Sequence, residues 1–384
     1  MATLPLEIWI MILDIVIEED IVRLDRCAHI TFSYHREFLS PGLHRYRFYG
    51  SYHRLRLVCR SFTAMLGTRP YCDLDTSSFP FPMSIRALRI VTYDGSFESI
   101  FQQLLEDTPR CDRLVCLDLS CWAYKELGQL DLSEFFSSCE GGAFPAVRRL
   151  NIWLHSERHL QRESSFWTRL HRAFPRLVTL FVGQDFGRLY LDGERDKVVI
   201  FEQLEILYFG QGIIFSECQF PHLRHASIEM VSNHSEVEIF RLSPHLESLH
   251  IRDWIVPSTI DVGDFPQLRV LSFHEECLYQ LLPLDRDHPL EHLWLSSANT
   301  LRSSGLMEEI SKRTPGISRI TIDTLPLNLD WRSRRIRKFE RMKLDSFGLS
   351  LRPVRPGDIL LVIERSATVV KEGIWKKVWR NIRR

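Results

Sequence analysis

The sequence predicts a short all-helical module at the N-terminus, followed by an irregular α/β solenoid whose strands form a parallel sheet. Two observations predict this class. Two stretches with helical apolar spacing, residues 4–17 and 51–67, lie near the N-terminus. Beyond them, the pattern L-x-x-L-x-[LIF] recurs at spacings of 19–33 residues. Periodicity of this length is typical of proteins built from stacked structural repeats.

Residues 4–17 (LPLEIWIMILDIVI) are apolar at every position except Glu7 and Asp14. Pro5 suits the first turn of a helix, where its missing N–H leaves no helical hydrogen bond unmade. A helix that is apolar nearly all round needs burial on most of its sides. We therefore expect either the rest of the chain or another protein to cover this helix.

Residues 51–67 (SYHRLRLVCRSFTAMLG) form a second predicted helix. Ser51 supplies an N-cap hydroxyl, and Gly67 suits the left-handed residue that follows a helix. The apolar side chains recur at helical intervals and so form one stripe, which consists of Leu55, Val58, Cys59, Phe62 and Leu66.

Together the two stretches resemble the F-box, the short helical module that docks onto the Skp-type adaptor of cullin ubiquitin ligases. The matching positions are Leu4, Pro5, Glu7, Ile8 and Ile12 at the opening of the motif, and Leu55, Val58, Cys59, Arg60 and Phe62 at its close. The resemblance implies an adaptor-binding module over residues 1–67, with residues 27–50 as an insertion. It further implies that the adaptor contact involves Leu4, Pro5, Ile8, Ile12, Leu55, Val58 and Phe62. The alternative is a helical hairpin that only caps a larger core.

Residues 68–84, which contain three prolines, predict a linker, and the repeats follow over residues 85–351. Each repeat has an apolar anchor residue, and these anchors are Ile85, Leu114, Val147, Leu177, Leu204, Leu223, Leu246, Leu268, Leu290 and Ile317. Side chains alternate along a strand, so the leucine-type positions point into the core and the residues between them point outward. The pattern is typical of leucine-rich repeats, although the asparagine that usually follows the strand is missing from nearly every copy.

This alternation predicts buried positions at Leu177, Leu180, Leu207, Leu249, Leu268 and Leu271. Helical segments are expected between strands at residues 97–105, 164–173, 236–242 and 305–312. The spacing of 19 residues between Leu204 and Leu223 leaves room only for a turn.

The outward positions include aromatic and arginine side chains, the types that dominate binding hot spots. We predict that five of them lie on one exposed concave face and anchor a protein substrate: Trp153, Phe181, Tyr208, Arg252 and Trp294. The alternative is that the C-terminal segment, or a neighbouring loop, covers them.

Residues 352–384 are predicted to be a basic C-terminal cap or tail. Strands are expected near residues 344–349 and 358–363, and a basic amphipathic helix over 373–384 could cap the open end of the solenoid. From Trp331 to Arg384 there are 16 Lys and Arg against 5 Asp and Glu, although the whole chain has no net charge. We favour a basic end balanced by an acidic body over a tail that binds nucleic acid or a membrane surface.

The sequence gives little support for a catalytic or metal-binding motif. The nine cysteines include no C-x-x-C pair, which favours buried free thiols in a reducing compartment, the cytoplasm or the nucleus. His288 and His292 match an H-x-x-E-H string, but Pro289 breaks the helix that zinc binding requires. No apolar run reaches the ~20 residues of a membrane span. We expect no catalytic residue, metal or cofactor, and no membrane partner.

The resemblance therefore implies a non-catalytic substrate-receptor subunit of a Skp–cullin–F-box ubiquitin ligase. Its partners would be the Skp-type adaptor, through it a cullin ligase, and a protein substrate that the sequence does not identify. One alternative is a leucine-rich-repeat interaction scaffold without a ligase role. A more distant alternative is a binder of nucleic acid or membrane that uses the basic C-terminus.

Overall fold

The structure is a computed structural model that describes residues 8, 12, 15, 71–74, 87–92, 114–123, 136–137, 139–140, 144–156, 166–184, 198–210, 218–231, 240, 243–254, 259, 261–297, 306–324, 349–351 and 360–365. The chain divides into two compact units, Met1–Pro244 (unit 1) and His245–Arg384 (unit 2). In both units successive repeats each add a strand to a parallel sheet, which confirms the predicted solenoid with a parallel sheet.

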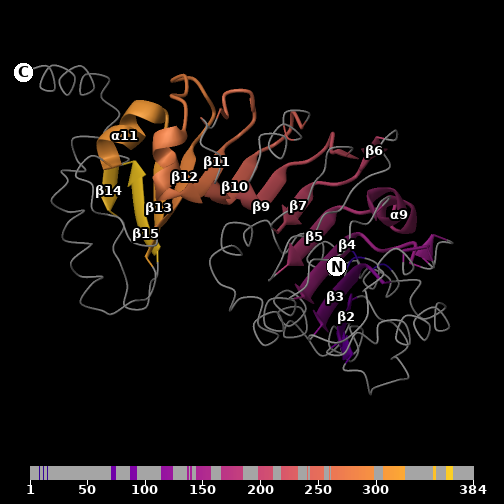
Figure 1. The fold of residues 1–384 in the computed structure, drawn as a ribbon. Coiled ribbons are helices and arrows are strands. Elements are labelled where there is room, and N and C mark those ends of the chain that lie inside the picture. Colours follow the sequence, from indigo (N-terminus) through magenta and orange to yellow (C-terminus); the bar gives the residue numbers. More distant parts are fainter. Residues whose placement is uncertain are drawn as a thin grey trace, which may run out of the picture. The chain divides into compact units, whose positions relative to one another are not determined.

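Unit 1 stacks its strands in chain order, and each strand lies parallel to the next. These strands are β1 (Tyr71–Leu74), β2 (Ala87–Thr92), β3 (Cys116–Ala123), β4 (Arg149–Ser156), β5 (Thr179–Gln184), β7 (Ile206–Phe209) and β9 (His225–Val231). Figure 1 shows β2, β3, β4, β5, β7 and β9 side by side, and helix α9 (Phe166–Ala173) lies between β4 and β5 in the chain. Two short strands, β6 (Val199–Ile200) and β8 (Cys218–Gln219), pair separately.

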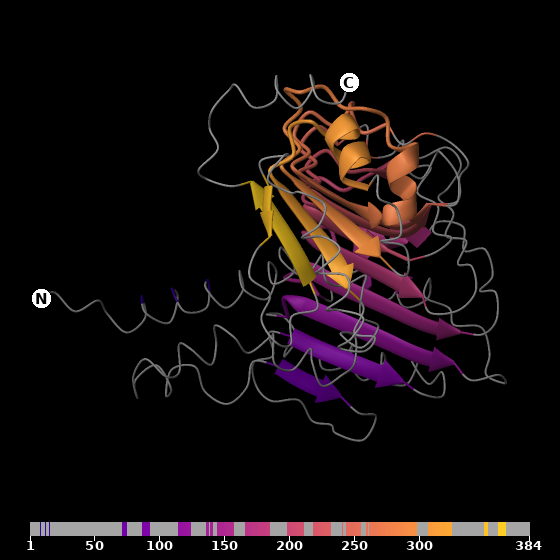
Figure 2. The same ribbon diagram turned by 90° about the vertical axis from the view of Figure 1, so that its left-hand side faces the viewer.

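Unit 2 begins with four parallel strands: β10 (Ser248–Trp254), β11 (Val270–His274), β12 (His292–Ser297) and β13 (Arg319–Thr324). A 3-10 helix, η3 (Glu275–Gln280), follows β11, and helix α11 (Leu306–Arg313) precedes β13. Figure 2 shows α11 against one face of these strands.

The end of unit 2 departs from the parallel pattern. Strand β15 (Leu360–Arg365) runs antiparallel to β13, and β14 (Leu349–Leu351) runs antiparallel to β15. Strands are predicted near both segments. Because they pair in the antiparallel direction, they lie at the end of the sheet and do not continue the series of parallel repeats. The predicted helix at 373–384 lies outside the described residues.

A second departure concerns the predicted linker at 68–84. Residues Tyr71–Leu74 within it form β1, which pairs with β2 in parallel and begins the sheet of unit 1. The nearby prolines predict a loop, and the sequence YCDL has no leucine pattern of its own. The linker prediction is therefore wrong for this segment, because pairing with β2 outweighs the local turn preference.

A repeated turn leads into six of the described strands. The N–H of the anchor residue donates to the carbonyl three positions earlier, at 3.1–3.4 Å. This bond joins Phe144 to Val147, Phe174 to Leu177, Phe201 to Leu204, Phe220 to Leu223, Phe265 to Leu268, and Thr314 to Ile317. Proline often occupies the second position of the turn, where its fixed φ is favourable. In each Phe-Pro pair of these turns the phenylalanine is thus a buried core residue, and the proline is a turn signal.

Successive repeats are joined by a shared carbonyl just before each strand. The carbonyl of Val115 accepts the N–H groups of both Arg148 and Arg149, at 2.9 and 3.0 Å. The carbonyls of Arg148, Val178, Glu205, Glu247, Arg269 and Glu291 each accept two consecutive N–H groups in the same way. This arrangement satisfies the backbone at the strand entrance, where regular pairing has not yet begun.

The core lies on the leucine face of the strands. The six predicted core leucines are at most 2% exposed, which confirms those positions. Aromatic rings extend this core at the turns: Phe144 stacks on Phe174, and Phe201 stacks on Phe220 at 5.6 Å. Helices α9 and α11 confirm the predictions at 164–173 and 305–312, whereas 97–105 lies outside the described residues. Within 236–242 only Phe240 is described, and it is helical.

Candidate functional site

The candidate site is the strand face opposite the leucine core. In each unit, one position of this face forms a row of register partners, which we name the outward row. In unit 1 the outward row consists of Asp118, Asn151, Phe181, Tyr208 and Ser227. In unit 2 it consists of His250, Ser272, Trp294 and Thr321. The rows follow from the two-residue alternation of side chains along a strand.

The outward rows are buried. Phe181, Tyr208 and Trp294 are only 7%, 6% and 7% exposed, and the remaining members are also shielded from solvent. The prediction that these three side chains lie on an exposed face is therefore wrong. Alternation decides which face of the sheet a side chain takes, but it does not decide whether that face meets water.

In unit 1 the centre of the outward row is aromatic. The rings of Phe181 and Tyr208 stack at a centroid distance of 4.0 Å. On the neighbouring strand, the buried Arg149 donates from Nε to Oδ1 of Asn151 at 3.2 Å. Burying a guanidinium is costly unless its donors are hydrogen-bonded, so this contact offsets part of the desolvation of Arg149. Sequence reasoning missed Arg149, because an arginine at an outward strand position reads as a surface residue.

In unit 2 a polar contact joins two strands. Nε2 of His292 on β12 is hydrogen-bonded to Oγ1 of Thr321 on β13 at 2.9 Å, and the imidazole also lies 5.9 Å from the ring of Trp294. Arg319 is the register partner of His292. Burial, reinforced by the charge of Arg319, lowers the pKa of His292 to about 4. His292 is therefore neutral at physiological pH.

The two histidines of the H-x-x-E-H string have different hydrogen-bond partners. Nδ1 of His288 accepts the N–H of Leu290 at 3.2 Å, within the turn before β12. Burial lowers the pKa of His288, and the backbone of Val262 and Phe265 partly opposes this shift. His292 instead contacts the next strand. Among the residues that the structure describes, no group of three or more His, Cys, Asp or Glu side chains is arranged to hold a metal ion.

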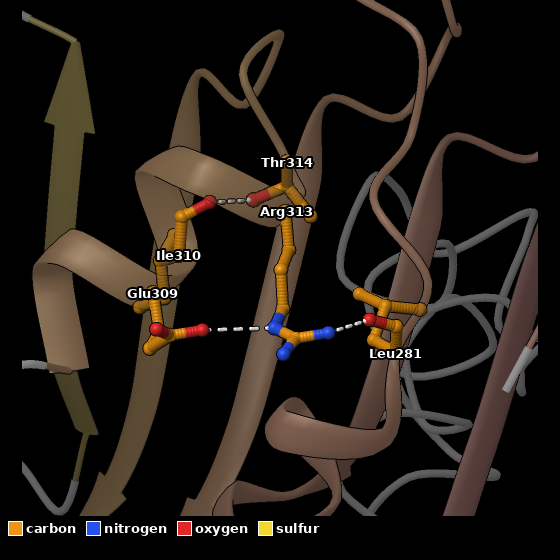
Figure 3. Close-up of polar contacts among 5 residues, drawn as sticks. All are labelled: Leu281, Glu309, Ile310, Arg313 and Thr314. Atoms are coloured by element: carbon orange, nitrogen blue, oxygen red, sulfur yellow. Dashed lines mark hydrogen bonds and ion pairs between the residues drawn. The ribbon is translucent and has the colours of Figure 1, made fainter. Parts of the chain in front are cut away.

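A second set of polar contacts, which the sequence did not reveal, links the end of helix α11 to the segment that follows η3 (Figure 3). Nε of Arg313 at the end of α11 donates to Oε2 of Glu309 at 2.9 Å, and its Nη1 donates to the carbonyl of Leu281. The carbonyl of Arg313 accepts the N–H of Leu284 at 2.8 Å. Thr314 continues from α11 and donates its hydroxyl to the carbonyl of Ile310. The helix end is thus fixed to the segment that follows η3.

For the other predicted site residues, the structure describes the backbone of some and leaves the rest outside the described residues. Trp153 occupies β4, where its register partner on β5 is Gly183, and Arg252 occupies β10. Their side chains lie outside the described part of the structure, so their role in binding stays a prediction. Of the predicted adaptor contacts, only Ile8 and Ile12 are described, and both are helical. Leu4, Pro5, Leu55, Val58 and Phe62 lie outside the described residues.

Comparison with known proteins adds little. No protein-family model matches the chain, and no curated protein matches it. A crystal structure of a Bacteroides fragilis protein, a structural-genomics target, matches with a TM-score of 0.30 and 14% identity. That match covers 62% of this chain and 65% of the other, so it spans less than two thirds of that protein. In the described residues, no helix is long and apolar enough to cross a membrane.

Proposed function

We propose that this protein is the substrate-receptor subunit of a Skp–cullin–F-box ubiquitin ligase and makes no bonds itself. The observation that carries the proposal is the order of the sequence features. An F-box-like pair of helical stretches over residues 4–66 precedes a repeat solenoid, the kind of domain that offers an extended surface to other proteins.

The described part of the first stretch is consistent with a docking role. Ile8, Ile12 and Ile15 are helical and lie on one side of the helix, because they are four and three residues apart. Ile8 and Ile15 are 36% and 54% exposed. A stripe of exposed apolar side chains can mark a docking surface, and the adaptor is the partner that the proposal assigns to it.

The mechanism of such a subunit is tethering. The N-terminal module would bind the adaptor and hence the ligase, while the solenoid would bind the substrate. Holding both in one assembly raises the effective concentration of the substrate's lysines near the ligase, to the order of mM for short flexible connections. The partners are the adaptor, the cullin ligase and a protein substrate in the cytoplasm, the nucleus or both.

The proposal is tested by co-purification of the adaptor with a Leu4→Asp, Val58→Asp double variant. Each substitution places a charge where an apolar side chain worth roughly 1.5–3 kcal/mol is expected to be buried. Adaptor recovery should fall to background while the thermal melt of the solenoid stays unchanged. Arg176→Asp, on an exposed turn of the solenoid, is the matched control and should leave recovery intact. Full recovery with the double variant would contradict the F-box assignment.

A repeat scaffold without a ligase role is the second candidate, and the repeat fold favours it equally. In that case the N-terminal helices would cap the core, and the double variant would lower the melting temperature with no adaptor to lose. The charge asymmetry of the C-terminus leaves a third candidate, a nucleic-acid binder. For this candidate, affinity should fall steeply and linearly on a log–log plot as salt increases.

A further inference from the structure

We draw no further inference here: the strongest candidate, the exposed apolar pair Val198 and Ile200 at strand β6 of unit 1, carries none because nothing in the structure shows what covers it.

Discussion

The rings of Phe181 and Tyr208 stack almost parallel, with centroids 4.0 Å apart and planes 7° apart. They are register partners on β5 and β7, and both are buried. Two aromatic rings in contact on neighbouring strands contribute beyond the area that each buries, typically ~0.5–1.5 kcal/mol. The pair therefore links two repeats on the face opposite the leucine core.

Replacing Tyr208 with Ala should lower the free energy of unfolding by about 3 kcal/mol or more, as large aromatic truncations in cores do. Arg176→Ala, at an exposed turn, should change it by less than ~0.5 kcal/mol. Denaturant titration of both variants measures the difference. A double-mutant cycle with Phe181→Leu and Tyr208→Leu should show a coupling energy near ~1 kcal/mol. Wild-type stability in Tyr208→Ala would mean that this ring faces solvent after all.

The sequence predicts the leucine face better than the opposite face, and the reason is physical. Leu180, Leu207 and Leu271 must be buried wherever the strands stack, because the repeated alternation sets them all on the same face of the sheet. Burial of Phe181 depends instead on what lies over the outward face. That information is absent from the local pattern, since aromatic side chains occur both in cores and on binding surfaces.

The local sequence pattern also does not predict strand direction or contacts between residues on the folded sheet. The apolar run at 358–363 predicts a strand, but its antiparallel pairing with β13 depends on how the chain returns to the sheet. The buried Arg149 is another case, because its role becomes visible only with Asn151 beside it. The Phe-Pro turns, by contrast, depend on local geometry, because the fixed φ of proline suits the second position of the turn.

Arg313 should be more important for stability than its place on a helix surface suggests. Its guanidinium joins Glu309 to the carbonyl of Leu281, and both side chains of the ion pair are largely shielded. Arg313→Met keeps much of the aliphatic stem but leaves both acceptors without this donor. A partly buried acceptor left unpaired costs about 1–3 kcal/mol.

The control for that variant is Arg172→Met. Arg172 is 55% exposed and lies 3.8 Å from Glu140, so this ion pair is expected to contribute well under ~1 kcal/mol. Thermal melts of the two variants should therefore differ clearly, with only Arg313→Met shifted downward. Equal melting temperatures would show that the contacts of Arg313 contribute no more than an ordinary surface pair.

Stability should fall on acidification because of His292. Its pKa is about 4 in the folded protein, against 6.5 as the ordinary value, so the unfolded chain binds more protons between these two values. The stabilisation is fully present above pH 6.5 and is lost as the pH falls toward 4. The loss from this residue is at most about 3 kcal/mol, at ~1.4 kcal/mol per unit of pKa.

The measurement is the midpoint of urea unfolding between pH 8 and 4, compared with His292→Gln. Glutamine can still hydrogen-bond to Thr321 but does not titrate, so the variant should show a flatter pH dependence in this range. His171 and His288, whose pKa values burial also lowers, keep contributing in both proteins and leave a shared slope. Identical pH profiles for the two proteins would contradict a special role for His292.

Glu247, Arg269 and Glu291 form a row of alternating charge at the entrances of three consecutive strands of unit 2. Their backbones are joined directly, because the N–H of Arg269 donates to the carbonyl of Glu247 and the N–H of Glu291 donates to that of Arg269. Neighbouring strands are ~4.8 Å apart, so charges of opposite sign occupy adjacent strand entrances. Opposite charges that face each other in antiparallel strand pairs typically contribute ~0.2–1 kcal/mol, and like charges are destabilising, so we expect an effect of at most this size between these parallel strands.

Arg269→Glu should therefore destabilise unit 2 by up to about 1 kcal/mol at low salt, because it places three like charges at adjacent strand entrances. The loss should shrink in ~1 M salt, where the screening length falls to about 3 Å. The decisive comparison is the triple variant Glu247→Arg, Arg269→Glu, Glu291→Arg, which inverts every charge and restores the alternation. If alternation is what matters, its urea midpoint should return close to that of the wild type. A triple variant as unstable as Arg269→Glu would show that other contacts of these side chains decide the effect.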